Sequence, residues 1–159
     1  KGLAHPFQTC VRGIQGSLIP VVFISIVVGY GTAVQATPVF GWLVEQVLSL
    51  DMNPYLLTFV AVNLLAGMTA NGTGGVTLFM ENFGATILGN PAINVGALHR
   101  IAAISGAGFD SLPHNGAIAF QLSVFKLSYK DGYFQQFMMS VLVNLLAGLL
   151  AVLMAVVLF

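Results

Sequence analysis

Long runs of the sequence contain no charged residue, and two of them restrict the possible fold more than any other feature. Residues 17–34 and residues 133–159 are each close to or above the roughly 20 apolar residues that a helix needs to cross a bilayer. Over the whole chain 57% of residues are hydrophobic and 6% are charged, with a mean hydropathy of +0.92. Soluble domains carry about 25% charged residues, so the sequence predicts an all-α membrane protein.

The order of apolar segments and breaks predicts one transmembrane unit over residues 1–159. A hairpin arm of 16 residues at about 1.5 Å per residue falls short of a hydrocarbon core about 30 Å thick, which favours a re-entrant hairpin. The alternative for Asn71 and Thr73 is a plain turn between two spans. We expect a spanning helix at 17–34, an interfacial helix at 38–50, a re-entrant hairpin at 55–88 with its tip at 71–75, a broken helix at 92–126 with its break at 106–116, and a spanning helix at 133–159.

The predicted break is the segment S-G-A-G-F-D-S-L-P-H-N-G at residues 105–116. Its glycines permit backbone angles and close approaches that other residues avoid, and Pro113 removes a backbone donor. A discontinuous helix leaves backbone polar groups free to bind a ligand inside a membrane protein. The side chains that accompany these groups are Asp110, Ser111, His114 and Asn115.

Two flanking cations indicate how deep the break lies. Arg100 precedes Gly108 by about 14 Å of helix and Lys126 follows Gly116 by about 15 Å, and each length is about half of the hydrocarbon thickness. We therefore expect the two cations at opposite interfaces and the break near the midplane, where secondary transporters form substrate sites.

Several function classes find no support in the sequence. Five basic and five acidic residues cancel, so no nucleic-acid partner is expected. Cys10 is the sole cysteine, and neither a metal site nor a cofactor is indicated. The H-E-x-x-H metalloprotease motif is absent, and Ser111 and His114 have no evident third partner for hydrolysis, so no enzyme is expected. The chain starts at Lys1 without a leader, and we expect it to be a piece of a longer protein.

Residues 98–117, L-H-R-I-A-A-I-S-G-A-G-F-D-S-L-P-H-N-G-A, resemble the signature region of the gluconate permease family of proton symporters. N-G-T-G-G-V-T-L at 71–78 is similar to that family's glycine- and serine-rich segment, and L-S-Y-K-D-G-Y at 127–133 resembles the loop after the signature. The resemblance runs from about Gly13 onward and implies the carboxyl-terminal part of such a permease. Its implied architecture is one repeat of an inverted-repeat transporter of the ion-transporter superfamily, with a re-entrant hairpin and a discontinuous helix.

The implied function is proton-coupled uptake of gluconate or a related sugar acid or hydroxy acid by a multi-pass protein of the bacterial inner membrane. The tip sequence Asn71-Gly72-Thr73 departs from the serine and alanine of many relatives, which leaves the particular acid open. Expected partners are the organic anion, the proton, the lipid bilayer, the first half of the permease and a second copy in a homodimer. Two alternatives remain open, namely a sodium-coupled organic-anion transporter and a non-transporting membrane fragment or assembly subunit.

The hairpin tip and the break are expected to meet and form the site. Asp110 is the expected coupling residue, because burial favours the neutral form of a carboxyl group and lets it exchange a proton. His114 would relay the proton or bind the anion; the alternative is that Asp110 and His114 only pair with each other or cap helix ends. The substrate carboxylate would be held by hydroxyl, amide and backbone N–H groups at helix N-termini, from Asn71, Gly72, Thr73, Gly74, Ser111, His114 and Asn115.

Overall fold

The computed structural model describes residues 6–159, and within that range it contains helices and no strands, which confirms the all-α fold class. Residues 1–5 of the predicted unit lie outside the described part. The helices α7, η2 and α8 run on from one another as a single helix, Tyr129–Leu158. The elements are α1 (Pro6–Gln35), α2 (Pro38–Leu48), α3 (Pro54–Thr69), α4 (Gly72–Leu88), α5 (Val95–Gly106), η1 (Phe109–Ser111), α6 (Gly116–Val124), α7 (Tyr129–Gln136), η2 (Phe137–Leu142) and α8 (Val143–Leu158).

An asparagine sets the start of four consecutive α-helices. The residue before each of α3, α4, α5 and α6 is an asparagine whose side-chain oxygen accepts a hydrogen bond from a backbone N–H in the first turn. Such N-caps satisfy donors that a helix leaves unpaired at its beginning. The buried cap Asn115 thereby pairs the start of α6 without water. These caps are Asn53, Asn71, Asn94 and Asn115.

Helix α3 lies at the centre of the fold and contacts α1, α4, α5, α8 and η1. Its side chains are buried around most of its circumference, with Ala61, Val62 and Ala66 fully inaccessible. Small residues bring α4 close: a Cβ added to Gly75 would lie 2.5 Å from the backbone nitrogen of Ala66. Close backbone approach of this kind is the usual way that apolar helices associate inside membranes.

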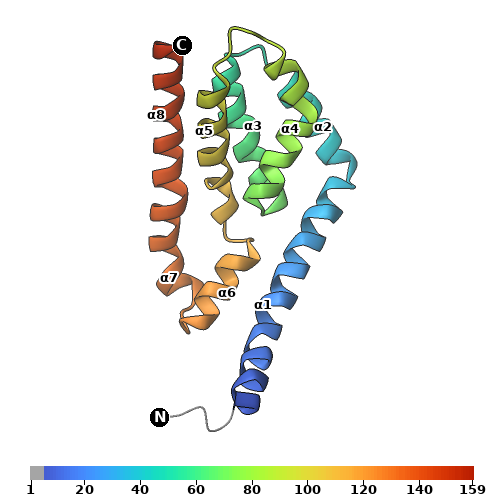
Figure 1. Ribbon diagram of the computed structural model, residues 1–159, viewed down its shortest axis with the longest axis vertical. Coiled ribbons are helices and arrows are strands. Elements are labelled where there is room, and N and C mark those ends of the chain that lie inside the picture. Colours follow the sequence, from blue (N-terminus) through green and yellow to red (C-terminus); the bar gives the residue numbers. More distant parts are fainter. Residues whose placement is uncertain (1–5) are drawn as a thin grey trace.

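The turn between α3 and α4 is tighter than the tip predicted at residues 71–75. Ala70 ends α3 in the left-handed conformation, with φ 51°, and α4 begins at Gly72. Residues 72–75 are therefore the first turn of a helix and not an irregular loop, because the Asn71 side chain caps them through the Gly74 N–H. In Figure 1 the turn between α3 and α4 lies level with a point partway along the terminal helix, and near the junction between α5 and α6.

The interruption predicted within residues 106–116 coincides with the end of α5 at Gly106 and the start of α6 at Gly116. The helix before it begins at Val95, three residues after the predicted start, because Asn94 caps it. The predicted interfacial helix corresponds to α2, which Thr37 caps. The first predicted span lies within the longer α1.

By length and composition, one helix in the described part of the chain qualifies to cross a membrane, namely Tyr129–Leu158, with a window of mean hydropathy 2.8. It begins four residues before the predicted span at 133–159, since Tyr129 already opens α7. Large apolar side chains of this helix are exposed, including Leu149, Leu150 and Leu153. A contiguous apolar surface of this kind is typical of contact with lipid or with another protein.

Candidate functional site

The start of α4 and the end of α5 are in direct backbone contact, so the hairpin turn and the break meet as expected. A Cβ added to Gly72 would lie 2.3 Å from the carbonyl oxygen of Gly106 and 3.4 Å from Asp110 Oδ2. A Cβ added to Gly106 would in turn lie 3.2 Å from the carbonyl oxygen of Gly72. Only glycine permits this approach at position 72. Two segments more than thirty residues apart in the sequence thus form one site.

Asp110 lies at this junction with its carboxylate half-buried. It accepts a hydrogen bond from Asn115 Nδ2 at 2.8 Å, and it lies beside the backbone of Gly72. Gly72 is the first residue of α4, a helix of 17 residues, whose N-terminus carries partial positive charge. The carboxylate therefore occupies the position where such a helix would bind an anion.

Asn115 joins the hairpin turn, the break and the start of α6. Its amide nitrogen lies within hydrogen-bonding distance of three oxygens, the Ala70 carbonyl at 2.9 Å, the Asp110 carbonyl at 2.5 Å and Asp110 Oδ1 at 2.8 Å. Its side-chain oxygen accepts from the backbone N–H of Ala117 at 2.6 Å. The side chain is 5% exposed, so water cannot replace these bonds easily.

The Asn115→Ala substitution is expected to destabilise the protein by about 1–3 kcal/mol, because it leaves buried oxygens unpaired and removes a cap. The measurement is the apparent unfolding temperature of the purified protein in detergent. Asn90→Ala is the matched control, since Asn90 also caps its own turn through the N–H of Ala92 but does so on the exposed surface. Equal shifts for the two variants would contradict a structural role of Asn115 at the junction.

Asn63 is a second buried amide that holds the break, and the sequence prediction did not include it. Its side-chain oxygen accepts from the backbone N–H of Phe109 at 3.3 Å, and its nitrogen donates to the Phe59 carbonyl at 2.9 Å. A Cβ added to Gly108 would lie 2.1 Å from Asn63 Oδ1, so the bond requires glycine there. A lone amide within the apolar helix α3 is the signal that points to such a role.

Two tyrosines of α7 hold the break from the other side. The Tyr129 hydroxyl donates to the Pro113 carbonyl at 3.0 Å, and the Tyr133 hydroxyl donates to the Ser111 carbonyl at 3.2 Å. They lie four residues apart and therefore on one face of the helix. The sequence prediction missed both, although their spacing at the start of an apolar helix indicates one shared surface.

A hollow lies beside Asp110. Some of the predicted site residues line it, and the others lie around it. His114 does not line the hollow; its Nε2 lies 2.7 Å from the Gly67 carbonyl, and its ring contacts Tyr30 edge-on with centroids 6.2 Å apart. Because a carbonyl only accepts, Nε2 carries the proton in this bond. Asn71 and Asn115 act as helix caps, the N–H of Gly74 is used by Asn71, and Ser111 offers its carbonyl to α7.

The hollow has a volume of about 410 Å³ and lies where α4, α5 and η1 meet. Within residues 6–159, no group of three or more histidine, cysteine, aspartate or glutamate side chains is placed to bind a metal ion. Of the predicted site residues, Gly72, Thr73 and Asp110 line the hollow. Gly106 was predicted only as part of the break, and the remaining lining is apolar. The full lining is Gly72, Thr73, Val76, Ala103, Gly106, Ala107 and Asp110.

Comparison with known proteins gives one transporter. The chain is 28% identical over 125 residues to the uncharacterized transporter YxjC of Bacillus subtilis (strain 168), across 77% of this chain and 26% of the relative. The chain thus spans about a quarter of the length of that relative. No protein-family model matches it, and no solved structure matches it either. The likeness and the apolar terminal helix indicate a membrane protein that resembles part of a transporter, without assigning it to the gluconate permease family.

Proposed function

We propose that this chain forms part of a secondary active transporter that carries gluconate, or a related small sugar acid or hydroxy acid, into the bacterial cell together with a proton. The observation that carries the proposal is the contact between the Asp110 carboxylate and the N-terminus of α4. This contact lies in the hollow where α4, α5 and η1 meet. Discontinuous helices with such termini form the substrate sites of secondary transporters. The resemblance of residues 98–117 to the gluconate permease signature supports the choice of substrate.

The lining of the hollow suits a small polar anion. Its volume of about 410 Å³ lies within the usual range of small-molecule sites. The first turn of α4 supplies the backbone N–H groups of Gly72 and Thr73 and partial positive charge for a carboxylate, and Thr73 adds an exposed hydroxyl. Catalysis is not part of this proposal, since binding and release are sufficient.

Asp110 couples binding of the anion to binding of the proton, because its carboxylate and the substrate carboxylate compete for the N-terminus of α4. When Asp110 is ionised, its carboxylate lies against the Gly72 backbone at the start of α4 and repels an incoming substrate carboxylate. When Asp110 is protonated, the charge is removed and the helix terminus accepts the substrate. Because each of the two ligands strengthens the binding of the other, anion and proton cross together. His114 acts in this scheme as a positioning residue, through its contact with Gly67.

The membrane arrangement belongs to the same proposal. Helices α3 and α4 have 16 and 17 residues, or about 24–26 Å each, and form a re-entrant hairpin in a bilayer core about 30 Å thick. Helices α5 and α6 form one discontinuous crossing. The protein is a multi-pass protein of the inner membrane, in which a further repeat of opposite orientation completes the site and two copies form a dimer.

Protection of Thr73 from chemical modification tests the proposed substrate site. In a Cys10→Ala background, Thr73→Cys is expected to react with a small charged thiol reagent, because Thr73 is exposed and lines the hollow. Gluconate at tenfold its dissociation constant should slow the reaction about tenfold. Reaction rates are measured by mass spectrometry on the full-length natural protein.

Thr77→Cys is the matched control, since Thr77 is exposed one turn further along α4 and does not line the hollow. Gluconate should leave its reaction rate unchanged, and sorbitol, which lacks the carboxylate, should protect neither position. Equal protection of both cysteines, or of neither, would contradict the proposed location. Protection that requires sodium ions would favour the sodium-coupled alternative, and a protein that binds no organic anion would favour the non-transporting subunit.

A further inference from the structure

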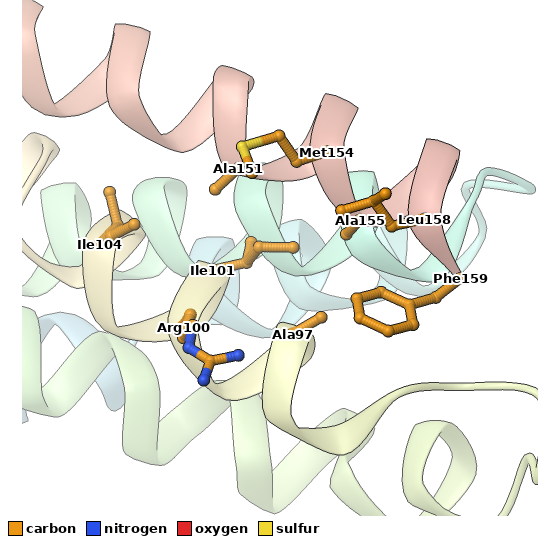
Figure 2. A pocket seen from close by; sticks show the side chains of 9 residues that line it. All are labelled: Ala97, Arg100, Ile101, Ile104, Ala151, Met154, Ala155, Leu158 and Phe159. Carbon is orange, nitrogen blue, oxygen red and sulfur yellow. The ribbon is translucent and has the colours of Figure 1, made fainter.

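A second hollow lies between α5 and the end of α8, and it shares no lining residue with the hollow beside Asp110. Its volume is about 370 Å³. Figure 2 shows Arg100 and Ala97 from α5 on one side and Met154 and Leu158 from the terminal helix on the other. Arg100 is the only charged residue among the nine that line it. The hollow thus combines a single cation with an otherwise apolar wall.

Arg100 has no counter-ion in the described part of the chain. No carboxylate of residues 6–159 forms an ion pair with it, and its side chain is exposed. An arginine remains charged under all ordinary conditions and presents a planar fork of donors. The fork is therefore free to bind an anion from outside the described chain.

The charged residues near the terminal helix indicate the depth of this hollow in a membrane. Lys130 and Asp131 lie at the start of that helix, and Arg100 lies beside its other end, where Leu158 and Phe159 line the same hollow. The uncharged stretch at 133–158 spans about 39 Å, which exceeds a hydrocarbon core of about 30 Å. When this helix crosses a bilayer, both sets of charges lie at headgroup level, and the apolar wall faces the acyl chains.

We propose that the α5/α8 hollow binds an anionic phospholipid. The phosphate of the headgroup pairs with the Arg100 guanidinium through two parallel hydrogen bonds, and one acyl chain covers the apolar wall formed by α5 and α8. Basic pockets between membrane helices recognise anionic headgroups. Charge complementarity selects an anionic lipid over a zwitterionic one, because only the former keeps a net negative charge to offer to an unpaired cation.

The test is a lipid titration of the full-length natural protein in non-ionic detergent, monitored by native mass spectrometry. Dioleoyl phosphatidylglycerol is expected to form a bound species at a lower concentration than dioleoyl phosphatidylcholine. Arg100→Gln should weaken phosphatidylglycerol binding about tenfold, as loss of a charge-assisted hydrogen bond does, and should remove the preference between the lipids. Arg100→Lys keeps the charge without the fork and should fall between the two.

Lys130→Gln is the matched control, because it removes an exposed cation at the opposite end of the terminal helix and should leave the titration unchanged. Glycerol 3-phosphate at the same concentration should not compete, since it lacks the acyl chains. Competition by it would overturn the lipid proposal in favour of a phosphate site. A lipid preference that survives Arg100→Gln would also overturn it. So would a wild-type protein that binds no phosphatidylglycerol, together with an Arg100→Gln variant that changes its oligomeric state. The titration requires no transport, so its failure is distinguishable from failure of the transporter proposal.

Discussion

The Gly72→Ala variant is expected to lose uptake of gluconate almost entirely, to less than about a tenth of the wild-type rate, because overpacking at a rigid contact displaces backbone. The added Cβ would lie 2.3 Å from the carbonyl oxygen of Gly106, and both partners belong to the main chain. Helices α4 and α5 must then separate, which opens the junction that positions Asp110. The measurement is initial uptake by proteoliposomes that contain the full-length natural protein.

Gly41→Ala is the control for this variant. Gly41 lies inside α2, and a Cβ added there meets nothing within 4 Å. Alanine favours a helix over glycine by about 1 kcal/mol, so this variant should keep wild-type uptake and be at least as stable. Wild-type uptake by Gly72→Ala would show that the close contact is dispensable and would contradict the proposed site.

The elements of this fold follow closely from local sequence, because each has a local physical cause. The uncharged run at 133–159 predicts the terminal helix, and Gly106 and Gly116 coincide with the ends of α5 and α6. The predicted hairpin tip at residues 71–75 differs slightly from the observed turn. The Asn71 side chain caps α4, and the chain reverses at Ala70, a residue that gives no sequence signal for a left-handed conformation.

The contacts that build the site are much harder to predict, since they join distant positions. Asn115 reaches the Ala70 carbonyl across 45 residues, and His114 reaches Gly67 across 47. Polar character alone placed both in a ligand site, whereas the structure gives them backbone partners. A buried amide or imidazole must pair with something, and one sequence without geometry does not distinguish a ligand from a carbonyl group. The meeting of the two glycine-rich segments is predicted because a ligand site needs polar groups from separate elements, and the glycines permit the close backbone approach that the structure shows.

Asp110→Asn is expected to abolish uphill accumulation of gluconate driven by an imposed pH gradient, while exchange of labelled for unlabelled gluconate continues. Asparagine keeps the shape and the neutral charge of protonated aspartate but cannot release a proton, so it mimics one state of the cycle. Asp131→Asn is the matched control, because Asp131 is exposed near the start of the terminal helix and lies outside the hollow. Both assays use proteoliposomes that contain the full-length natural protein.

The pH dependence of gluconate binding separates coupling by Asp110 from a merely structural effect of the same variant. Ionised Asp110 repels the substrate carboxylate, so the protonated protein is the form that binds. A lower pH increases the protonated fraction, and the apparent affinity of the wild type should rise as the pH falls, by at most about tenfold per pH unit for one linked proton. The Asp110→Asn protein should show a flat profile at the high-affinity level, whereas a misfolded site would bind weakly at every pH. Wild-type accumulation with an unchanged pH profile would remove Asp110 from the coupling step, and accumulation driven by a sodium gradient alone would favour sodium as the coupling ion.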